Sequence, residues 1–370
     1  MSSGAPVRQD NPPVSHDDEE APKIAISGRQ ALFFGFFVVS AVAFLYFVLP
    51  QVAGLSETWD RLESGNPWWL TTALLFRVGS YAGYMWLFET VCVRNHPRIG
   101  WKASYLITMA GIAATRLFAA AGAGGIALTA WALRRAGLDR REVATRMVAF
   151  NVLLYTVYAL ALLVGGFGLY FGVFAGNAPF AITMIPAFVM AGAFVIVYTT
   201  ALVPGDVERR LAGWAEGHGR FHRIVARLGA APASLSEGVR MTVEIVRRRE
   251  WGVLGAFLWW GFDIATLWAA FHAFSGHTPE IAVIVVAYFV GMFGNLLPLP
   301  GGIGGVDGGM IGAFAAFGVD FGLAAVAVLT YRAFAFWLPT VPGAIAYLQL
   351  RKEVASWKDD GPGAPAHSYT

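Results

Sequence analysis

The chain has 370 residues, of which 56% are hydrophobic and 14% are charged, and its formal net charge is +3. An ordinary soluble domain has about 25% charged residues, so this composition excludes a typical globular protein in water. The single cysteine excludes an intramolecular disulfide, and the sequence has no zinc or iron–sulfur spacing. Apolar segments of about 20 residues recur, each long enough to cross about 30 Å of hydrocarbon. The sequence therefore predicts an all-α, polytopic integral membrane protein.

The domain organisation follows from where the apolar segments begin and end. Residues 1–30 are polar and include an acidic run, which predicts a disordered cytoplasmic tail. A single transmembrane domain is expected over 31–352, and a second disordered tail over 353–370. Six apolar segments predict full membrane spans: 31–50, 67–90, 147–172, 179–203, 251–274 and 325–349.

The basic residues predict the orientation of these spans. Arginine and lysine accumulate in 91–102, 134–146 and 205–250, and the last segment alone holds nine arginines. The connections 173–178 and 275–280 contain neither residue. Because basic loops stay on the cytoplasmic side, both termini are predicted to be cytoplasmic, and the protein to lie in the plasma membrane.

Two further apolar segments, 103–133 and 281–318, do not fit as full spans. Each has both ends on the same predicted side, and each contains a glycine-rich break, at 121–125 and 298–305. Irregular backbone at membrane depth survives only where protein or a water-filled cavity surrounds it. The two segments are therefore predicted to be re-entrant helical hairpins that enter from opposite faces. Such a pair also indicates an inverted repeat, a recurring plan of transporters.

Charged residues remain inside the apolar segments. They are three arginines and two aspartates: Arg77, Arg116, Arg332, Asp263 and Asp307. A charge at the bilayer centre costs about 2.5–3.5 kcal/mol or more, so these residues are expected to face the bundle interior. One interpretation is structural, with ion pairs such as Arg332–Asp263 holding helices together. The other is a binding site, because the arginines outnumber the aspartates and guanidinium groups suit phosphate.

The second break, NLLPLPGGIGGVD at 295–307, also has two interpretations. A helix that starts near residue 308 would offer free N–H groups to an anion, although Asp307 as its N-cap would satisfy those groups and repel a phosphate. Alternatively, the glycines at 301, 305 and 309 form a row of small residues that allows close helix packing.

The segment 205–250 is amphipathic, with Leu235, Val239 and Val243 at helical spacing between arginines. It is predicted to lie as a helix in the inner membrane interface. There the arginines either attract anionic lipid headgroups or simply keep the segment on the cytoplasmic side.

Two runs, NLLPLPGGIGGVDGGMIGAF (295–314) and TYRAFAFWLPTVPG (330–343), resemble the transmembrane flippase-like family. This family includes the membrane region of lysylphosphatidylglycerol synthase. The resemblance implies movement of a lipid, or of a lipid-linked headgroup, between leaflets. By motif position it points to these residues: Arg116, Asn295, Pro300, Gly301, Gly302, Gly305, Asp307 and Arg332. The first break departs from the family pattern, because AGAGG at 121–125 has no proline and no acid follows it.

Together these observations predict a lipid translocase-like transporter without covalent chemistry. Its polar interior would be lined by Arg77, Arg116, Asp263, Asn295, Asp307 and Arg332. No nucleotide-binding loop, hydrolase motif or soluble aminoacyl-transfer domain is present, so enzyme activity is not expected. The expected partners are membrane lipids, either a phospholipid or a polyprenyl-phosphate-linked substrate, with a homodimer left open; no nucleic acid, metal or cofactor is expected. Two alternatives remain, a non-transporting subunit that regulates a glycosyltransferase or lipid synthase, and an ion-coupled carrier of a small polar solute.

Overall fold

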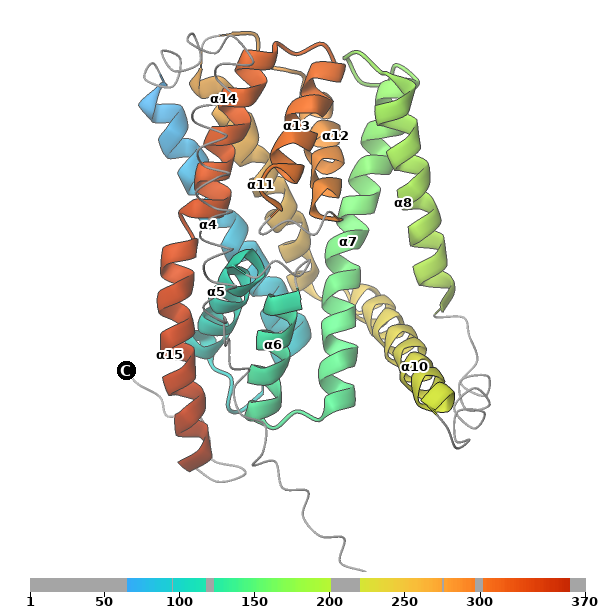
Figure 1. Cartoon of the computed structure of the whole chain (residues 1–370), viewed down its shortest axis with the longest axis vertical. Helices are drawn as coiled ribbons and strands as arrows, with labels where there is room; N and C mark the ends of the chain where they lie inside the picture. The colour runs from blue at the N-terminus through green and yellow to red at the C-terminus, as the bar shows by residue number, and fades with distance from the viewer. Residues whose placement is uncertain are drawn as a thin grey trace, which may run out of the picture.

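The computed structural model describes residues 65–94, 96–117, 123–200, 220–274, 276–296 and 302–359, with only the backbone described over 220–233. The predicted tail 1–30 and the first predicted span, 31–50, lie outside these residues. The described residues form helices and connections, with no β-strand among them. The α-helices are α4 (Pro67–Phe88), α5 (Trp101–Leu117), α6 (Ala123–Ala136), α7 (Arg140–Tyr170), α8 (Phe180–Thr200), α10 (Arg220–Arg247), α11 (Leu254–Ala273), α12 (Ile281–Met292), α13 (Gly305–Ala316), α14 (Phe321–Arg332) and α15 (Thr340–Asp359) (Figure 1). The chain is therefore all-helical over the described ranges, as predicted.

Four helical runs in these ranges are long and apolar enough to cross a membrane: Arg140–Tyr170, Phe180–Thr199, Trp251–Ala273 and Phe321–Trp357. The last run joins α14 to α15 through a π-helical turn, η7 (Ala333–Trp337). Helix α4 has 22 residues but lies outside this set, and its apolar sequence is interrupted by Arg77. Helix α15 continues to Asp359, beyond the predicted end of the domain at 352.

Two pairs of short helices are arranged as opposed hairpins. In Figure 1, α5 and α6 lie in the lower half of the molecule, while α12 and α13 lie in the upper half. In each pair, a glycine allows the two helices to pack backbone against backbone. A Cβ at Gly125 would lie 2.5 Å from the carbonyl oxygen of Gly111 across the first pair, and a Cβ at Gly294 would lie 2.2 Å from the carbonyl carbon of Gly305 across the second. Side chains at these positions would force the helices apart.

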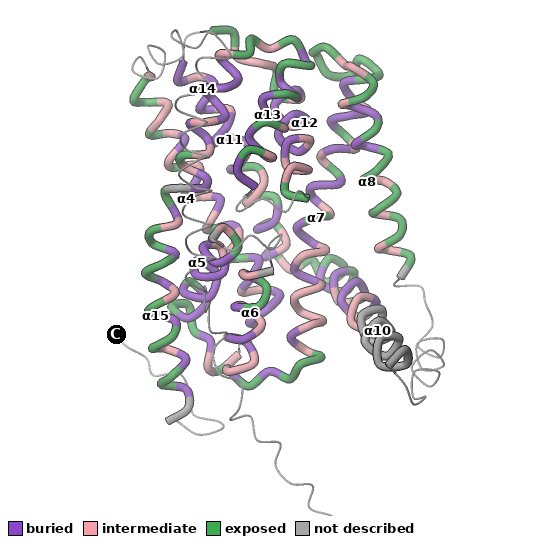
Figure 2. Tube along the Cα trace, in the orientation of Figure 1, coloured by how far each residue is buried: buried purple, intermediate pink, exposed green. Residues whose placement is uncertain are grey.

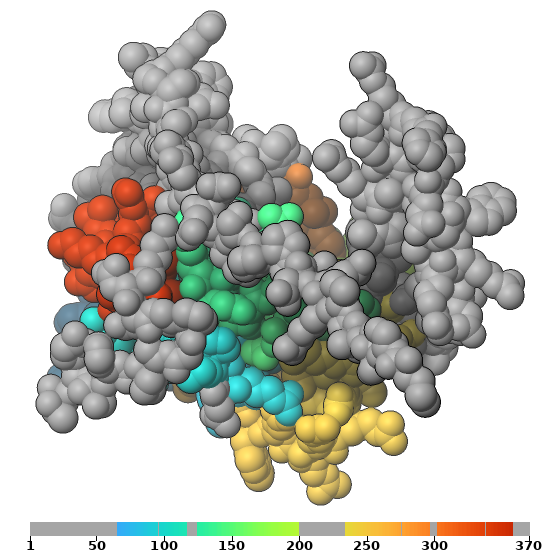
Figure 3. Space-filling model, turned by 90° about the horizontal axis from the view of Figure 1, so that it is seen from below, coloured from blue at the N-terminus to red at the C-terminus, as the bar shows by residue number. Residues whose placement is uncertain are grey.

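The two ends of the molecule differ in charge. The connections between α7 and α8, α11 and α12, and α13 and α14 lie at the upper end and contain no lysine or arginine. The segment 134–146, which contains five arginines, joins α6 to α7 at the lower end (Figure 1). Seen from below, the α6–α7 region lies between α15 and α10 (Figure 3). The segregation of charge on which the predicted topology depends is thus present in the fold.

The hydrophobic interior consists of two clusters. One lies in the lower half and includes Leu106, Leu133 and Leu350, whereas the other lies in the upper half and includes Phe271, Phe289 and Phe314. Trp260 packs against both clusters. Figure 2 shows that burial is concentrated in the central helices, while α8 is exposed along much of its length. The described ends of α5 and α12 that precede the two breaks lie near mid-height (Figure 1).

Candidate functional site

The most deeply buried charges are an ion pair between α4 and α11. Arg77 and Asp263 are only 2% and 3% exposed, and the Nη1 atom of the arginine contacts the Oδ1 atom of the aspartate. Asp263 Oδ2 accepts hydrogen bonds from the hydroxyls of Tyr288 at 2.6 Å and Tyr331 at 3.2 Å. Further hydrogen bonds offset part of the cost of burying such a pair, and here they satisfy the aspartate and Arg77 Nη2, whereas Arg77 Nε has no hydrogen-bond partner among the described residues. The pair connects α4 to α11.

The second ion pair connects α13 to α14. Arg332 Nε lies 2.5 Å from Asp307 Oδ1, and Asp307 Oδ2 accepts a hydrogen bond of 2.8 Å from the Gly304 N–H. The expectation that Arg332 pairs with Asp263 is wrong, because Asp263 is taken by Arg77. The expectation that Asp307 is the N-cap is also wrong: Gly304 caps α13, and Asp307 stands in its first turn. A carboxylate in that turn is favoured by the positive end of the helix dipole.

Arg116 differs from the other two arginines in its partners. It lies in the last turn of α5, where the helix dipole favours a cation. Its guanidinium donates to the Tyr81 hydroxyl at 3.0 Å and to the Phe336 carbonyl oxygen at 3.2 Å. Among the residues that the structure describes, no carboxylate lies within ion-pair distance of Arg116. Of the three arginines predicted from sequence, Arg116 is therefore the one that forms no ion pair with a described carboxylate.

The segment from Arg332 to Phe336 receives contacts from both hairpins. Arg116 at the end of α5 bonds to the Phe336 carbonyl, and Asp307 at the start of α13 bonds to Arg332. The guanidinium carbons of Arg116 and Arg332 lie 5.7 Å and 4.8 Å from the centroid of the Phe336 ring. Both arginines are therefore within cation–π range of a single aromatic face.

The backbone of this segment is unusual for a physical reason. The turn Ala333–Trp337 is π-helical, a geometry that occurs frequently at functional sites. Pro339 follows it and has no N–H to offer the Ala335 carbonyl four residues earlier. That carbonyl instead faces the Tyr81 hydroxyl, at 3.5 Å. The proline and the wide turn together leave carbonyl oxygens open to side chains from other helices.

We call the connected residues the central cluster: Arg77, Tyr81, Arg116, Asp263, Tyr288, Asp307, Tyr331, Arg332 and Phe336. It unites five of the residues predicted from sequence, and it contains three guanidinium groups and two carboxylates. Tyr81 joins its parts, because its hydroxyl accepts from Arg77 at 2.7 Å as well as from Arg116. The cluster can attract one anionic group, and within the described residues no group of three or more His, Cys, Asp or Glu side chains could hold a metal ion.

The remaining predicted residues lie around the second break. Pro300 and Gly301 are outside the described residues. Asn295 is exposed, and its Nδ2 lies 3.3 Å from the Met292 sulfur, so no direct contact joins it to the central cluster. Gly302 has a φ of 66°, a left-handed conformation that L side chains rarely adopt. Gly305 packs on Gly294, a contact of the close-packing kind predicted for this row of glycines.

Sequence reasoning missed four members of the site: Tyr81, Tyr288, Tyr331 and Phe336. A signal for Tyr81 was present, because it follows Arg77 by four residues and so lies on the same helix face. Tyr288 and Phe336 gave no such signal, because they sit in apolar segments among many other aromatic residues. Their roles depend on which helices become neighbours in the fold.

The helices, the membrane-length runs and the buried intramembrane charges define the chain as a multi-pass helical membrane protein. The sequence profile described as "Lysylphosphatidylglycerol synthase TM region" matches residues 32–343. The chain belongs to this family.

Curated relatives are archaeal proteins named only as UPF0104 membrane proteins. One from Methanothermobacter thermautotrophicus is 25% identical over 320 residues, which cover 84% of this chain and 93% of the relative. Another match in the same organism is 29% identical over 195 residues, or 47% of this chain and 57% of the relative. A relative from Pyrococcus horikoshii is 31% identical over 110 residues, covering 30% of this chain and 33% of the relative. The similarity to the first relative therefore extends over nearly its whole length.

Proposed function

We propose that the protein moves a lipid with a phosphate-bearing headgroup between membrane leaflets, without covalent chemistry. The observation that carries this proposal is Arg116, a guanidinium deep in the bundle whose described partners are a hydroxyl and a main-chain carbonyl. Burying a cation without a carboxylate is costly, and such residues in membrane proteins usually mark substrate or ion pathways. A headgroup phosphate would supply the missing negative charge and accept a bidentate pair of hydrogen bonds.

The proposed topology has six full spans and two opposed re-entrant hairpins, α5–α6 and α12–α13, in the plasma membrane with both termini cytoplasmic. The opposed half-height hairpins and the arginine-rich lower end support this arrangement. Membership of the lysylphosphatidylglycerol synthase transmembrane family supports a lipid as the substrate. The lipid tails would remain in the bilayer while the headgroup crosses beside the central cluster.

The proposed mechanism uses the segment that both hairpins contact. When a phosphate binds Arg116, it competes with the Tyr81 hydroxyl and the Phe336 carbonyl for the guanidinium N–H groups. This competition would release the tip of α5–α6 from η7, while the Arg332–Asp307 pair keeps α13 attached. The headgroup would thereby be exposed toward one hairpin and then the other, as in alternating access between two repeats.

The test is reconstitution of the whole chain in vesicles that contain a fluorescent anionic phospholipid, with a membrane-impermeant reductant as the reporter of leaflet. We expect Arg116→Gln to slow transfer at least about tenfold, which corresponds to about 1.4 kcal/mol in the barrier. Arg116→Lys should fall between, because an ammonium is a point charge without the planar fork. The matched control is Arg351→Gln, an exposed arginine on α15.

A parallel set of vesicles containing a labelled polyprenyl phosphate separates the two lipid classes that share this headgroup chemistry. Transfer of only one of the two identifies the substrate class. Equal transfer by the wild-type protein and Arg116→Gln would remove Arg116 from the mechanism. No transfer of either lipid by the wild-type protein would overturn the proposal.

A further inference from the structure

A second region of the molecule, on the side of α7 next to α8, has the features of a lipid site. A cavity of about 710 Å³ lies among α6, α7 and α8, and Leu235 of α10 also lines it. Its walls are largely apolar and include Ile126, Met147, Ala193, Val197 and Leu235. No member of the central cluster lines it. Its volume is within the range of about 300–1,000 Å³ that holds small ligands.

The cavity exists because α7 and α8 are close at one end and apart at the other. Near the upper end, a Cβ at Gly166 would lie 2.6 Å from the Thr183 carbonyl oxygen, so glycine lets the two helices touch. Toward the lower end the contact is made instead by long side chains, with the Tyr198 hydroxyl 2.8 Å from the Thr156 hydroxyl. Figure 1 shows the two helices diverging toward the lower end. The wedge between them is the cavity.

A second, adjoining cavity of about 870 Å³ places arginines beside the first. It shares Phe194 and Tyr198 with the apolar cavity, and their stacked rings, with centroids 4.4 Å apart, form the partition. Its lining includes two arginines and a glutamate of α10, and the arginine that follows this helix: Arg240, Glu244, Arg247 and Arg248. The mouth of the first cavity adds Arg134 and Arg140. The charged residues that line the two cavities are therefore mostly basic.

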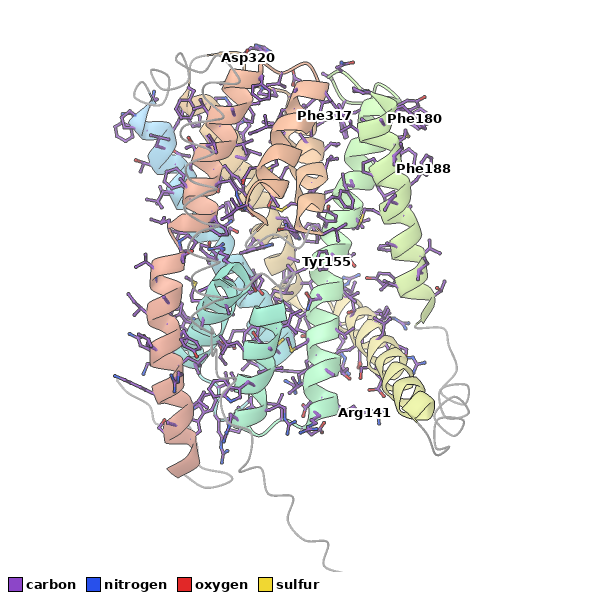
Figure 4. The ribbon with its side chains drawn as sticks, in the orientation of Figure 1. Arg141, Tyr155, Phe180, Phe188, Phe317 and Asp320 are labelled. Atoms are coloured by element: carbon purple, nitrogen blue, oxygen red, sulfur yellow. The ribbon has the colours of Figure 1, made fainter. Side chains whose placement is uncertain are left out.

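Helix α10 is held in place to present these arginines. Arg141 of α7, which Figure 4 marks at the lower end of the helix, forms an ion pair with Glu237. Thr242 donates a hydrogen bond to the Ala149 carbonyl oxygen at 3.3 Å. Glu237 and Thr242 thus face α7, while Arg240 and Arg247 are exposed. The basic face of α10 is oriented by packing and does not depend on a ligand.

The cavity is at membrane depth, because both α7 and α8 contain runs long and apolar enough to span. Tyr155, at mid-height on α7 in Figure 4, lines it and is 57% exposed. A polypeptide in such a wedge would have to satisfy its own backbone polar groups, whereas an acyl chain has none. Basic pockets between transmembrane helices on the cytoplasmic side bind the headgroups of anionic lipids. The shape, the apolar lining and the charge therefore favour one class of occupant.

We propose that this groove is a binding site for an anionic phospholipid. One acyl chain lies in the apolar cavity against Phe194 and Tyr198, and the phosphate lies beside Arg240 and Arg247 of α10. The site is separate from the central cluster, and it holds a lipid whether or not the protein moves one. The occupied groove fills the wedge between α7 and α8 and joins α10 to them through the headgroup.

The test is native mass spectrometry of the full chain purified from membranes in mild detergent, followed by exchange into vesicles of phosphatidylglycerol and phosphatidylcholine. We expect the wild-type protein to retain an anionic phospholipid. Ala193→Trp fills the cavity with a large ring and should lower the retained fraction at least about tenfold. The matched control is Ile196→Trp on the same helix, which lines neither cavity and is 68% exposed. Both positions are exposed, so both variants should fold, which size-exclusion chromatography checks.

The headgroup part is tested by Arg240→Gln/Arg247→Gln, with Arg351→Gln as the control. Each arginine near an anionic group contributes roughly fivefold in affinity, so the double variant should bind phosphatidylglycerol about twenty-fivefold more weakly. Equal retention by Ala193→Trp and Ile196→Trp, or the absence of lipid from the wild-type protein, would overturn the proposal. Arg116→Gln should keep the bound lipid, so a failed translocation test and a failed groove test give different results.

Discussion

The two short hairpins, α5–α6 and α12–α13, are closed by the same kind of packing but bring different charges to the middle of the molecule. In each, a glycine lets one helix lie directly on the backbone of the other. The first hairpin contributes Arg116, which no described carboxylate neutralises. The second contributes Asp307, which forms an ion pair with Arg332 and accepts a hydrogen bond from the Gly304 N–H at the start of its own helix.

This difference separates two functions that a buried charge can serve. Asp307 completes a pair, so its removal would leave a buried guanidinium without compensation. Arg116 completes no pair among the described residues, so its removal should cost little stability and affect binding instead. If the proposed function holds, the second hairpin acts as a structural anchor and the first carries the contact to the anion. Three experiments on the hairpins test this distinction, and a fourth provides a reference outside them.

The largest effect is expected for Asp307→Ala. Removing one partner of a buried ion pair lowers the free energy of unfolding by about 3–5 kcal/mol, because the remaining charge stays in the interior without compensation. Thermal unfolding in detergent should show a corresponding loss. The double variant Asp307→Ala/Arg332→Leu should recover part of it, since both charges are then absent. A double variant no more stable than the single one would mean that the pair is not the anchor of α13.

The next effect concerns the glycine contacts. Gly294→Ala places a Cβ against the backbone of Gly305, so we expect a loss of about 1–3 kcal/mol from overpacking. Gly308→Ala on α13 meets no atom within 4 Å and should stabilise by up to about 1 kcal/mol, because alanine favours a helix. Unfolding curves of the two variants provide the comparison. Equal behaviour would show that the hairpin does not need the close contact.

Arg116→Gln should cost less stability than Asp307→Ala, because glutamine removes the cation as well as its hydrogen bonds and so leaves no charge without a partner. The same variant should slow lipid transfer at least about tenfold. Its main effect is therefore on transfer, whereas the main effect of Asp307→Ala is on stability. Unfolding and transfer are measured on the same preparation. A large loss of stability in Arg116→Gln would assign the first hairpin the same anchoring function as the second.

The smallest effect lies outside both hairpins and serves as a reference for them. The hydrogen bond from Arg141 holds the pKa of Glu237 below its ordinary value of 4.5. A lowered pKa means that this contact stabilises the protein above about pH 4.5 and that the contribution is lost as pH falls further. Glu237→Gln should remove that pH dependence and cost about 1 kcal/mol or less, because the pair is partly exposed. Unfolding midpoints of the wild type and of Glu237→Gln from pH 7 down to about pH 3 measure it.

Much of the architecture could be predicted from where arginine and glycine stand. The arginines near 134–146 and the connections without basic residues defined the two ends, and the breaks near 125 and 300 indicated short helices. The five charged members of the central cluster were all found, because a charge in an apolar segment is rare enough to notice.

The partners of those charges could not be predicted. Arg77 and Asp263 are far apart in sequence, and only the packing of α4 on α11 decides that they meet and that Arg332 turns to Asp307. The packing itself depends on glycine, since a Cβ at Gly255 would lie 2.4 Å from the Gly83 carbonyl oxygen. The π-helical turn could not be predicted either. Its hydrogen bond runs from the Leu338 N–H to the Ala333 carbonyl oxygen, five residues earlier, and no local sequence pattern indicates it.

Pro339 has a consequence that reaches beyond its own turn. Because its ring nitrogen carries no hydrogen, the Ala335 carbonyl remains available to Tyr81, which in turn orders two arginines from different helices. Alanine at this position would let the backbone close an ordinary i→i−4 bond and straighten the run from Phe321 to Trp357 into one rod. The polar centre would then lose its alignment although no charged residue had changed, so the sensitivity of this protein to substitution extends to an apolar position that touches no ligand.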